Sequence, residues 1–447
     1  MDVRRPATIS AVLTVSFLIS ACADPVGRET VHGVNKPSTV CESRAVPDRF
    51  IVKWKDGSVS VESAADTETL EREFIEPNRD EIEFVEHDFR VSIHSPVEDF
   101  VESNALPPAD TDWGQIDTGA YEAWKIATGD GVTVAVIDSG VDTYHPQLVN
   151  RIAINTGEIP DDGIDNDNNG FVDDVRGFDF HKYSIGKGGS GDINDDIQGH
   201  GTHVAGIILA EHTPGGLMKG IAPRAKLIPL NFMGPDGSGY IGDAIFAIDY
   251  AVRRGARIIN ASWGGPSCST ALLQKIAALE GAGVLFVTAA GNGDPYTGIG
   301  YNLDYRGDYP AAFGLPGQIT VGATNVYGRM TGFSNYSYNL VHLMAPGWQI
   351  LSTFPTTGRA KCSGYSPRTG YCYLSGTSMA APFVAGAAAL LWSYRPQATV
   401  AQIKAAIMQS VTPGEYQTVS RGRLNIRRAL DVLAGLTGAP SAAMHLK

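Results

Sequence analysis

The stretch Val132-Thr-Val-Ala-Val-Ile-Asp-Ser-Gly140 decides the fold class. Its apolar run, rich in β-branched residues, ends at an acidic residue and a Ser-Gly turn, which is typical of a buried strand in a parallel sheet. Similar runs follow at 227–230, 258–261, 284–289 and 319–321, and helical patterns occur at 203–211, 240–254, 270–280 and 377–394. This alternation predicts an α/β fold, a mostly parallel, buried sheet with helices on both faces.

The helical segment 377–394 allows two interpretations. No charged residue occurs between Arg368 and Arg395, and an apolar stretch of this length could span a bilayer. Pro382 and the many Ala and Gly residues favour instead a central helix that is buried on all sides by protein. We expect the second arrangement.

Net charge and the amino terminus bear on partners and location. The formal net charge of −13 argues against nucleic acid as a partner, because clustered Lys and Arg bind phosphate backbones. Arg4 and Arg5 precede a short apolar stretch, 7–21, that is typical of an export signal. Residues 21–23 fit a small-x-small cleavage site, whereas 19–22 resemble a bacterial lipobox, which we favour. Lipidation of Cys22 would then anchor the exported protein to the membrane of the cell envelope, and the alternative is an extracellular protein without a lipid.

The rest of the chain divides by composition. Residues 23–47 are polar and irregular and predict a tether after the export signal at 1–22. Residues 48–94 predict a small α+β module with a βαββ outline. Residues 95–112 contain three prolines and predict an exposed linker that is easily cleaved. The main domain then covers 113–436, and 437–447 form a tail.

The chain has five cysteines, an odd number for an exported protein, in which pairing is expected. Lipidation of Cys22 would leave four. Cys362 and Cys372 lie close in the sequence, in a loop rich in Gly, Ser and Tyr, and predict a local disulfide. Cys41 and Cys268 remain, either as a pair or, if the region of Cys41 is cleaved away, with Cys268 as a buried thiol.

Asp138 and His200 stand at a strand end and a helix start, where open α/β sheets place ligand clefts. A carboxylate at Asp138 can hold the Nδ1–H of an imidazole, although acidic strand ends are common. His200 lies in Gly199-His-Gly-Thr-His-Val-Ala-Gly206 and can move a proton between a hydroxyl and a leaving amine. Zinc binding by His200 and His203 is disfavoured, because the pair lacks the i,i+4 spacing and nearby Glu of a zinc-protease helix. We expect His203 to be structural.

Two further motifs supply a nucleophile and a donor. Ser375-Gly-Thr-Ser-Met-Ala-Ala-Pro382 puts Ser378 in the first turn of the segment 377–394, where N–H groups and the helix dipole can hold an oxyanion. A lone Ser there is more often a helix cap. Ala289-Ala-Gly-Asn-Gly293 puts Asn292 just past a buried strand, where its amide can donate to the same oxyanion. The alternative for Asn292 is a simple Asn-Gly turn.

The order Asp138, His200, Asn292, Ser378, with these flanking sequences, resembles the subtilisin-like serine proteases over residues 113–436. The resemblance implies that Asp138, His200 and Ser378 form a catalytic triad and that Asn292 is an oxyanion donor. It also implies a serine endopeptidase with protein or peptide substrates and no organic cofactor.

The same resemblance extends to the substrate strand and to the small module. It implies that Ser262, Trp263 and Gly264 pair with the substrate backbone. Trp263 replaces a smaller aliphatic residue, so we expect its ring to narrow or reshape the cleft. Residues 48–94 resemble the propeptide of the family, which acts as a folding chaperone and intramolecular inhibitor of a proenzyme.

An acid-rich stretch, residues 161–174, stands apart from these motifs. The spacing of Asp165, Asp167, Asn169 and Asp173 resembles the first nine positions of an EF-hand calcium loop. The twelfth position is Arg176, so the bidentate Glu is missing. Because so many acids would repel one another without a cation, we predict a structural calcium site, and the alternative is a solvated acidic loop.

Two other functions stay open on the sequence alone. One is a non-catalytic subtilisin-fold protein that binds peptides or serves as a surface scaffold, and the other is a calcium-dependent adhesion module. The second leaves the four protease motifs unexplained. The sequence favours peptide-bond hydrolysis through an acyl-enzyme on Ser378.

Overall fold

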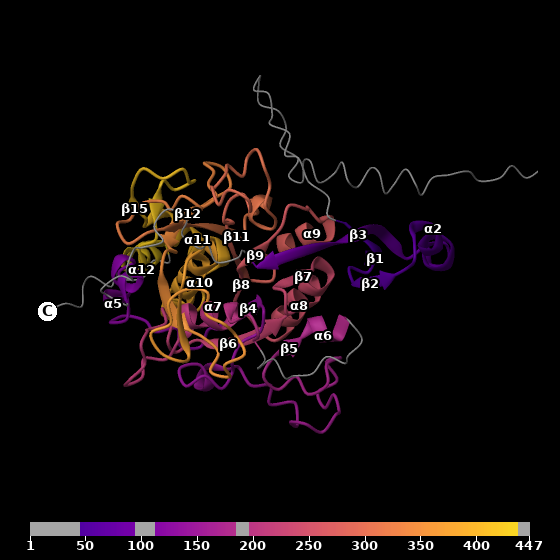
Figure 1. Cartoon of the computed structure of the whole chain (residues 1–447), viewed down its shortest axis with the longest axis horizontal. Coiled ribbons are helices and arrows are strands. Elements are labelled where there is room, and N and C mark those ends of the chain that lie inside the picture. The colour runs from indigo at the N-terminus through magenta and orange to yellow at the C-terminus, as the bar shows by residue number, and fades with distance from the viewer. Residues whose placement is uncertain (1–44, 94–111, 185–195, 437–447) are drawn as a thin grey trace, which may run out of the picture.

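The computed structural model describes residues 45–93, 112–184 and 196–436. We call residues 112–436 the main domain and residues 45–93 the amino-terminal module, which extends from one side of the main domain (Figure 1). The predicted export signal with Cys22, nearly all of the tether, most of the linker and the tail lie outside the described residues.

A nine-stranded sheet forms the centre of the main domain, in the order β15-β16-β12-β11-β10-β8-β4-β6-β5. Every neighbouring pair is parallel except β15 and β16. The prediction of a mostly parallel sheet is therefore confirmed. The strands are β4 Thr133–Asp138, β5 Phe178–Asp179, β6 Lys226–Asn231, β8 Ile258–Ala261, β10 Leu285–Ala289, β11 Gln318–Thr324, β12 Leu343–Pro346, β15 Thr412–Pro413 and β16 Gly422–Arg423. A separate antiparallel pair consists of β13 Ile350–Thr353 and β14 Tyr371–Leu374.

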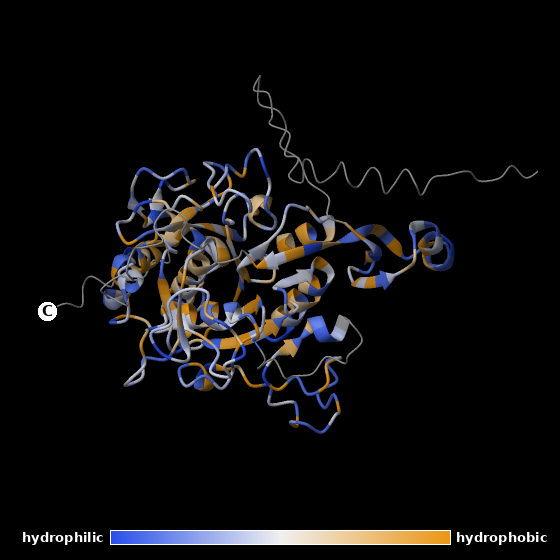
Figure 2. Cartoon of the chain, viewed as in Figure 1, coloured by the Kyte–Doolittle hydropathy of each residue, from blue (hydrophilic) through white to orange (hydrophobic). Residues whose placement is uncertain are grey.

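The two faces of this sheet bury two separate apolar cores. On β4, Val134 and Val136 belong to the first core, and Ala135 and Ile137 belong to the second. Apolar colour accordingly gathers on the elements at the centre of the main domain (Figure 2). The first core holds α7 His200–Leu209, α10 Thr377–Tyr394, α11 Val400–Gln409 and α12 Ile426–Leu436, and the second holds α8 Ile241–Arg253 and α9 Thr270–Leu279. Helices on both faces explain why the strands are apolar throughout.

Helix α10 lies at the centre of the first core. Every residue from Thr377 to Trp392 is buried. Packing is so close at Gly386 that an added Cβ would lie 2.6 Å from the Cβ of Ile221. The predicted central helix is thus confirmed. Among the described residues, no helix combines the length and the apolar character needed to cross a bilayer.

Several shorter elements complete the main domain, and one helix begins before its apolar pattern does. Helix α7 begins at His200, the helix start that its motif predicts, three residues before the apolar helical pattern expected at 203–211. Gly199, with φ 77°, precedes it, and an added Cβ there would lie 2.2 Å from the ring of Phe354. The small polar residues of the first turn hide the helical period from a hydrophobicity pattern. The shorter elements are α4 Trp113–Asp117, α5 Ala120–Ala123, η2 Val149–Arg151, α6 Phe180–Ser184, β7 Ser238–Tyr240, β9 Trp263–Gly264 and η3 Ala311–Phe313.

The amino-terminal module has a ββαβ order rather than the predicted βαββ. Its elements are β1 Ala45–Trp54, β2 Val59–Ser63, a helical segment of α2 Thr67–Leu70, η1 Glu71–Ile75 and α3 Glu76–Asn78, and β3 Ile82–Ile93. Strand β2 was not predicted, and the pieces expected at 82–86 and 89–93 form one strand. Asp88 interrupts the apolar pattern between them, but its carboxylate is buried against Arg49, with Nε at 2.6 Å. The strand therefore continues through a polar position.

Strand β3 belongs to both bodies. It pairs with β1 inside the module and with β7 and β9 of the main domain. The module has a small core of its own, made of Phe50, Val52, Leu70 and Val85. Phe84, Phe89, Val91 and Ile93 of β3 instead join the second core of the main domain. So small a core gives little stability alone, and the module therefore depends on its contact with the main domain.

Candidate active site

Asp138 and His200 meet where β4 ends and α7 begins. The Nδ1 atom of His200 lies 2.8 Å from Oδ1 of Asp138, and their side chains are 2% and 0% exposed. The backbone N–H of Ser139 donates to the same Oδ1 at 2.8 Å and holds the carboxylate. Burial alone would lower the pKa of His200, but the charge and hydrogen bond of Asp138 outweigh it, so this pKa is raised. The Nε2 atom of His200 has no hydrogen-bond partner within the described part of the chain.

Ser378 lies in the first turn of α10, as the motif predicts, and is buried. Its Oγ donates to the backbone oxygen of Ser262 at 3.1 Å. In return, Oγ of Ser262 donates to the backbone oxygen of Ser378 at 3.0 Å. This reciprocal pair fixes the start of α10 against the residue that precedes β9.

Asn292 follows β10 and faces the same helix start. Its Oδ1 accepts from the N–H and from the Oγ of Thr377, both at 2.8 Å. A Cβ added to Gly376 would lie 3.0 Å from the Nδ2 of Asn292. With Oδ1 held by Thr377, the amide nitrogen is turned toward the backbone of Gly376, where the absence of a side chain leaves room.

The predicted substrate strand β9 pairs with the chain's own β3. Strand β3 runs between β9 on one side and β7 on the other, antiparallel to both. The opposed residues are Ser92 and Gly264, Ile93 and Trp263, and Val91 and Gly239. The third predicted residue, Ser262, is next in line and contacts Ser378.

The ring of Trp263 lies inside the second core. It is fully buried, its Nε1 donates to the backbone oxygen of Ile137 at 2.9 Å, and its centroid lies 5.0 Å from that of Phe232. Val91 and Ile93 of β3 belong to the same apolar cluster. The ring of Trp263 therefore belongs to the apolar cluster in which Val91 and Ile93 of β3 are buried.

Comparison with known proteins shows the family to which this chain belongs. The sequence profile of the subtilase family matches residues 129–423. The chain belongs to the subtilase family. As a subtilase it is a serine peptidase, and the expectation from the sequence motifs is confirmed to that extent.

Relatives of this subtilase align over most of its length. The major intracellular serine protease of Bacillus subtilis (strain 168) is 37% identical over 280 residues, which are 62% of this chain and 74% of that protein. The thermophilic serine proteinase of Bacillus sp. (strain AK1) is 30% identical over 416 residues, 86% of this chain and 89% of that one. The crystal structure of fervidolysin from Fervidobacterium pennivorans, described as a keratinolytic enzyme related to subtilisin, has a TM-score of 0.67 at 24% identity. That likeness covers 86% of this chain and 61% of the other, and it shows the fold.

One buried carboxylate of the subtilase site was not singled out from the sequence. Oδ1 of Asp196 accepts from Oγ of Ser139 at 2.9 Å and from the N–H of Gly199 at 2.8 Å. Its Oδ2 accepts from the N–H and Oγ of Thr202 at 2.9 and 2.6 Å. Burial raises the pKa of Asp196 to about 6 in spite of these bonds. Asp196 thus fixes the start of α7, and with it His200, although no motif of the sequence singles it out.

His203, on the same helix, has the structural place that was expected. Its Nε2 lies 3.0 Å from the backbone oxygens of Ile350 and Cys372. Burial lowers the pKa of His203 to about 3. A neutral imidazole therefore links α7 to strands β13 and β14.

The amino-terminal module covers the start of α9 with Glu86. The carboxylate accepts from the N–H groups of Thr270 and Ala271 at 3.0 and 3.1 Å and from the hydroxyl of Ser269. These N–H groups have no partner within the helix, and they lie at the positive end of its dipole. Burial raises the pKa of Glu86, and the three hydrogen bonds offset only part of this rise.

A second carboxylate of β3 covers the start of α8. Asp88 accepts from the N–H of Gly242 at 3.0 Å. Arg49 of the module joins Asp88 to Asp243 of the main domain through two ion pairs. Burial raises the pKa of Asp88. The two bodies are therefore joined by buried polar groups as well as by apolar packing.

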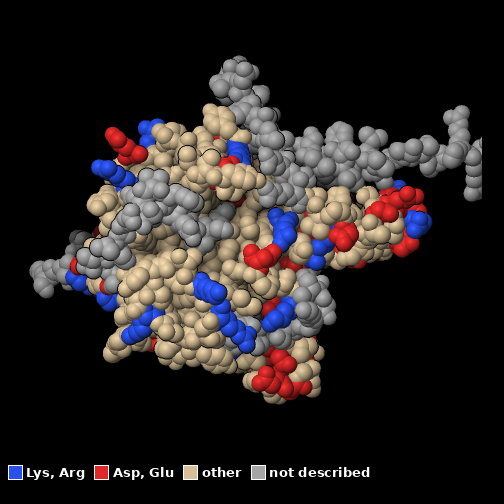
Figure 3. Space-filling view, in the orientation of Figure 1, with Lys and Arg blue, Asp and Glu red and all other residues tan. Residues whose placement is uncertain are grey.

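Three acids converge and could hold a cation, two of them in the acid-rich stretch 161–174 and one just before it. Glu158, Asp165 and Asp167 each place a carboxylate oxygen within 4.8 Å of the others. They lie in the loop before β5, where Asp and Glu form a patch at the lower edge of the molecule (Figure 3). Glu158 was not predicted, because it precedes the EF-hand-like pattern.

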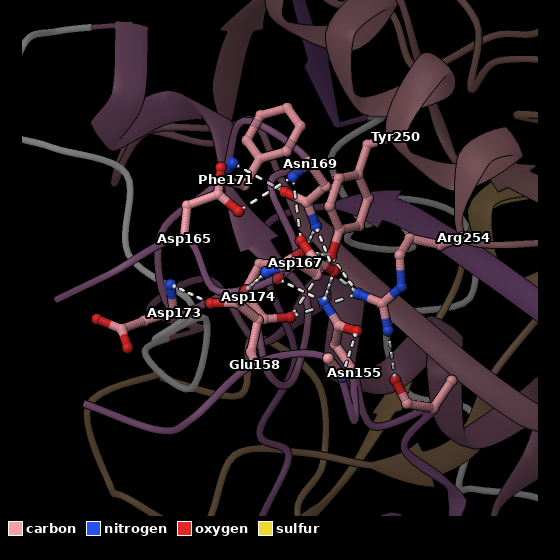
Figure 4. A network of polar contacts seen from close by, with 12 residues as sticks. Asn155, Glu158, Asp165, Asp167, Asn169, Phe171, Asp173, Asp174, Tyr250 and Arg254 are labelled. Atoms are coloured by element: carbon pink, nitrogen blue, oxygen red, sulfur yellow. Dashed lines mark hydrogen bonds and ion pairs between the residues drawn. The ribbon is translucent and has the colours of Figure 1, made fainter. Parts of the chain in front are cut away.

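The other two predicted ligands make different contacts. The carboxylate of Asp173 accepts from the N–H groups of Asp162 and Gly163, both at 3.1 Å, and it points away from the cluster (Figure 4). The amide of Asn169 donates to Asp167 and Asp174 at 3.1 and 3.0 Å. The structure thus brings together Asp165 and Asp167, with Glu158 in place of Asp173.

Disulfides account for the described cysteines. Cys362 and Cys372 are joined with an Sγ–Sγ distance of 1.85 Å, the pair that their spacing predicted. Cys268, which directly precedes the N-cap residue of α9, Ser269, is also disulfide-bonded. In the uncut chain Cys268 is therefore not a free thiol.

Proposed function

We propose that this subtilase is a serine endopeptidase, made as an exported proenzyme, that hydrolyses peptide bonds in proteins through an acyl-enzyme on Ser378. The observation that carries the proposal is the extended strand β3 between β7 and β9, which runs toward Ser262 and thus toward Ser378. A substrate in the same position, continued by one residue, would bring a carbonyl carbon beside the Ser378 hydroxyl.

The residues then have distinct roles in acyl transfer. Oγ of Ser378 attacks the carbonyl carbon while Nε2 of His200 takes its proton, and Asp138 holds the imidazole by Nδ1. The Asn292 amide and the N–H of Ser378 donate to the oxyanion. His200 gives the proton to the leaving amine as the C–N bond breaks. Water then attacks the ester with His200 as base, which releases the acid and restores Ser378; no organic cofactor takes part.

Substrate binding is by strand addition. Ser262, Trp263 and Gly264 would pair with the substrate backbone as β9 pairs with β3. The chain continues beyond Ile93 toward the linker, so the groove holds the interior of a polypeptide. This supports an endopeptidase.

The amino-terminal module would be the intramolecular inhibitor of the proenzyme. It fills the proposed substrate groove with β3 and is held there by Glu86 and Asp88. Cleavage within the linker 95–112 would convert the proenzyme. The export signal and lipobox at 1–22 support a location outside the cytoplasm, with a lipid anchor at Cys22 or as a secreted protein.

A calcium ion would stabilise the acid-rich loop. Glu158, Asp165 and Asp167 provide only oxygen ligands, the type that calcium prefers. Backbone N–H groups of Asn166 and Asp173 donate to Glu158 at 2.8 and 3.0 Å and hold it in place. The ion would support the fold and take no part in the reaction.

The proposal is tested by hydrolysis of a mixed peptide library, with products identified by mass spectrometry. Wild type is compared with Ser378→Ala and with Ser393→Ala, which changes a serine near the other end of α10. We expect cuts in peptide interiors from wild type and Ser393→Ala, and none from Ser378→Ala. Removal of terminal residues alone would contradict an endopeptidase. No hydrolysis by mature, calcium-loaded wild type would favour a non-catalytic, peptide-binding scaffold.

A further inference from the structure

We propose that the disulfide of Cys268 keeps the amino-terminal module covalently attached to the main domain after the linker 95–112 is cut. Release of the module then requires reduction of this disulfide as well as proteolysis. The covalent link is inferred from the cysteines alone; its effect on activity rests on the proposed role of the module as an inhibitor.

The cysteine content of the chain restricts the partner of Cys268. Cys362 and Cys372 are bonded to each other, and Cys268 is disulfide-bonded. The full sequence holds only two more cysteines, Cys22 and Cys41, which lie outside the described residues. Both precede the first strand of the module. With either partner, the disulfide joins the main domain to the segment that leads directly into the module.

The described residues around Cys268 favour Cys41. Ser269, the next residue, donates to Glu86 of the module, so Cys268 lies at the contact between the two bodies. Ala45, the first residue of β1, packs against the apolar cluster that contains Cys268. Cys41 and Ala45 are four positions apart in the sequence, a separation that can span about 14 Å.

Two covalent connections therefore hold the module. One is the polypeptide after β3, which passes through the linker, and the other is the disulfide on the opposite side of the module in sequence. A cut in the linker removes only the first. The remaining connection keeps the local concentration of the module on the order of 1 mM, as for a short flexible link. A dithiol would donate two electrons to the disulfide, leaving two cysteine thiols and becoming a cyclic disulfide itself.

The test of the link does not use the chain's own activity. The full chain with Ser378→Ala receives a recognition sequence for a site-specific protease within residues 95–112, is cut by that protease, and is denatured after free thiols are alkylated. We expect one species before reduction, with the summed mass of both fragments, and two species after dithiothreitol. Two separate fragments without reductant would overturn the proposal.

Matched variants show which disulfide is responsible. The double change Cys362→Ser and Cys372→Ser should leave the fragments joined, and Cys268→Ser should release them without reductant. If Cys268→Ser does not fold, the comparison of the unchanged Cys268 chain before and after reduction decides by itself. If the fragments of the Cys362→Ser, Cys372→Ser chain separate without reductant, the link depends on Cys362 or Cys372, and the proposal for Cys268 is wrong.

A second measurement addresses the consequence for activity. The active chain that lacks Cys362 and Cys372 is allowed to cut its linker, diluted to about 1 μM, and assayed with and without dithiothreitol. Because dilution lowers the local concentration of a released module from about 1 mM to about 1 μM, hydrolysis should rise by up to ~10³-fold on reduction. A joined but fully active protein before reduction would refute the inhibitory role while leaving the covalent link.

Discussion

Replacing Glu86 by Gln should weaken the contact between the module and the main domain about tenfold. The carboxylate accepts three hydrogen bonds at the start of α9. The isosteric amide keeps one acceptor oxygen and places an NH₂ group against a backbone N–H. A hydrogen bond to a charged group contributes ~1.5–3 kcal/mol. Because burial raises the pKa of Glu86, desolvation of the charge offsets part of this, so the lower value applies, and ~1.4 kcal/mol is a factor of ten.

The assay is inhibition of the main domain, freed of its module, by a peptide of residues 45–93. The inhibition constant of the Glu86→Gln peptide is compared with that of the unchanged peptide at neutral pH. Glu83→Gln, an exposed position of the same strand, is the matched control and should change nothing. Equal constants for the Glu86→Gln and unchanged peptides would refute the assignment of Glu86 as the residue that holds α9.

Three further predictions concern pH, calcium and the local disulfide. Catalysis needs neutral His200, whose pKa is raised, so kcat/KM should fall as pH drops through a value above the ordinary 6.5. Asp196→Asn removes a charge that helps to raise the pKa of His200, so the acidic limb of the pH profile should move to lower pH. An unmoved limb would show that the charge of Asp196 does not affect His200. In a solution whose free calcium concentration is about 100 times the dissociation constant of the site, removal of the calcium by EDTA should lower the free energy of unfolding by ~2–3 kcal/mol. Glu158→Gln should abolish that dependence, and thermal denaturation measures both. Changing Cys362 and Cys372 to Ser should cost ~2–3 kcal/mol in urea unfolding at pH 8, given the short loop that the bond closes, whereas an unchanged midpoint would show that the loop is held by other contacts.

Much of the main domain could be predicted because its strands and central helix are apolar throughout and end sharply. The strand at 258–261 and the helix at 377–394 have the predicted bounds. The module was predicted less well, since β2 is short and only partly buried. The buried ion pair of Asp88 with Arg49, distant in the sequence, allows a polar residue inside a strand.

The site shows the same division between local motifs and contacts made by folding. Asp138 and His200 lie in motifs whose flanking residues are informative, and the fold brings them to 2.8 Å. Glu158 and Asp196 lie outside any such motif. Their roles depend on which N–H groups and carboxylates the chain brings to them, and spacing along the sequence does not encode this.

The position of β3 between two flanking strands also determines the shape of polypeptide that can enter the groove. Adjacent strands lie about 4.8 Å apart, so the backbones of β7 and β9 are separated by roughly 9.6 Å, with one strand between them. A helix with its side chains is about 10–12 Å wide and does not fit, whereas a single extended chain does. We therefore expect a folded target to be cut only where its chain has locally opened. Two proteins with identical residues around the cleaved bond would then differ in lifetime according to how often that segment unfolds.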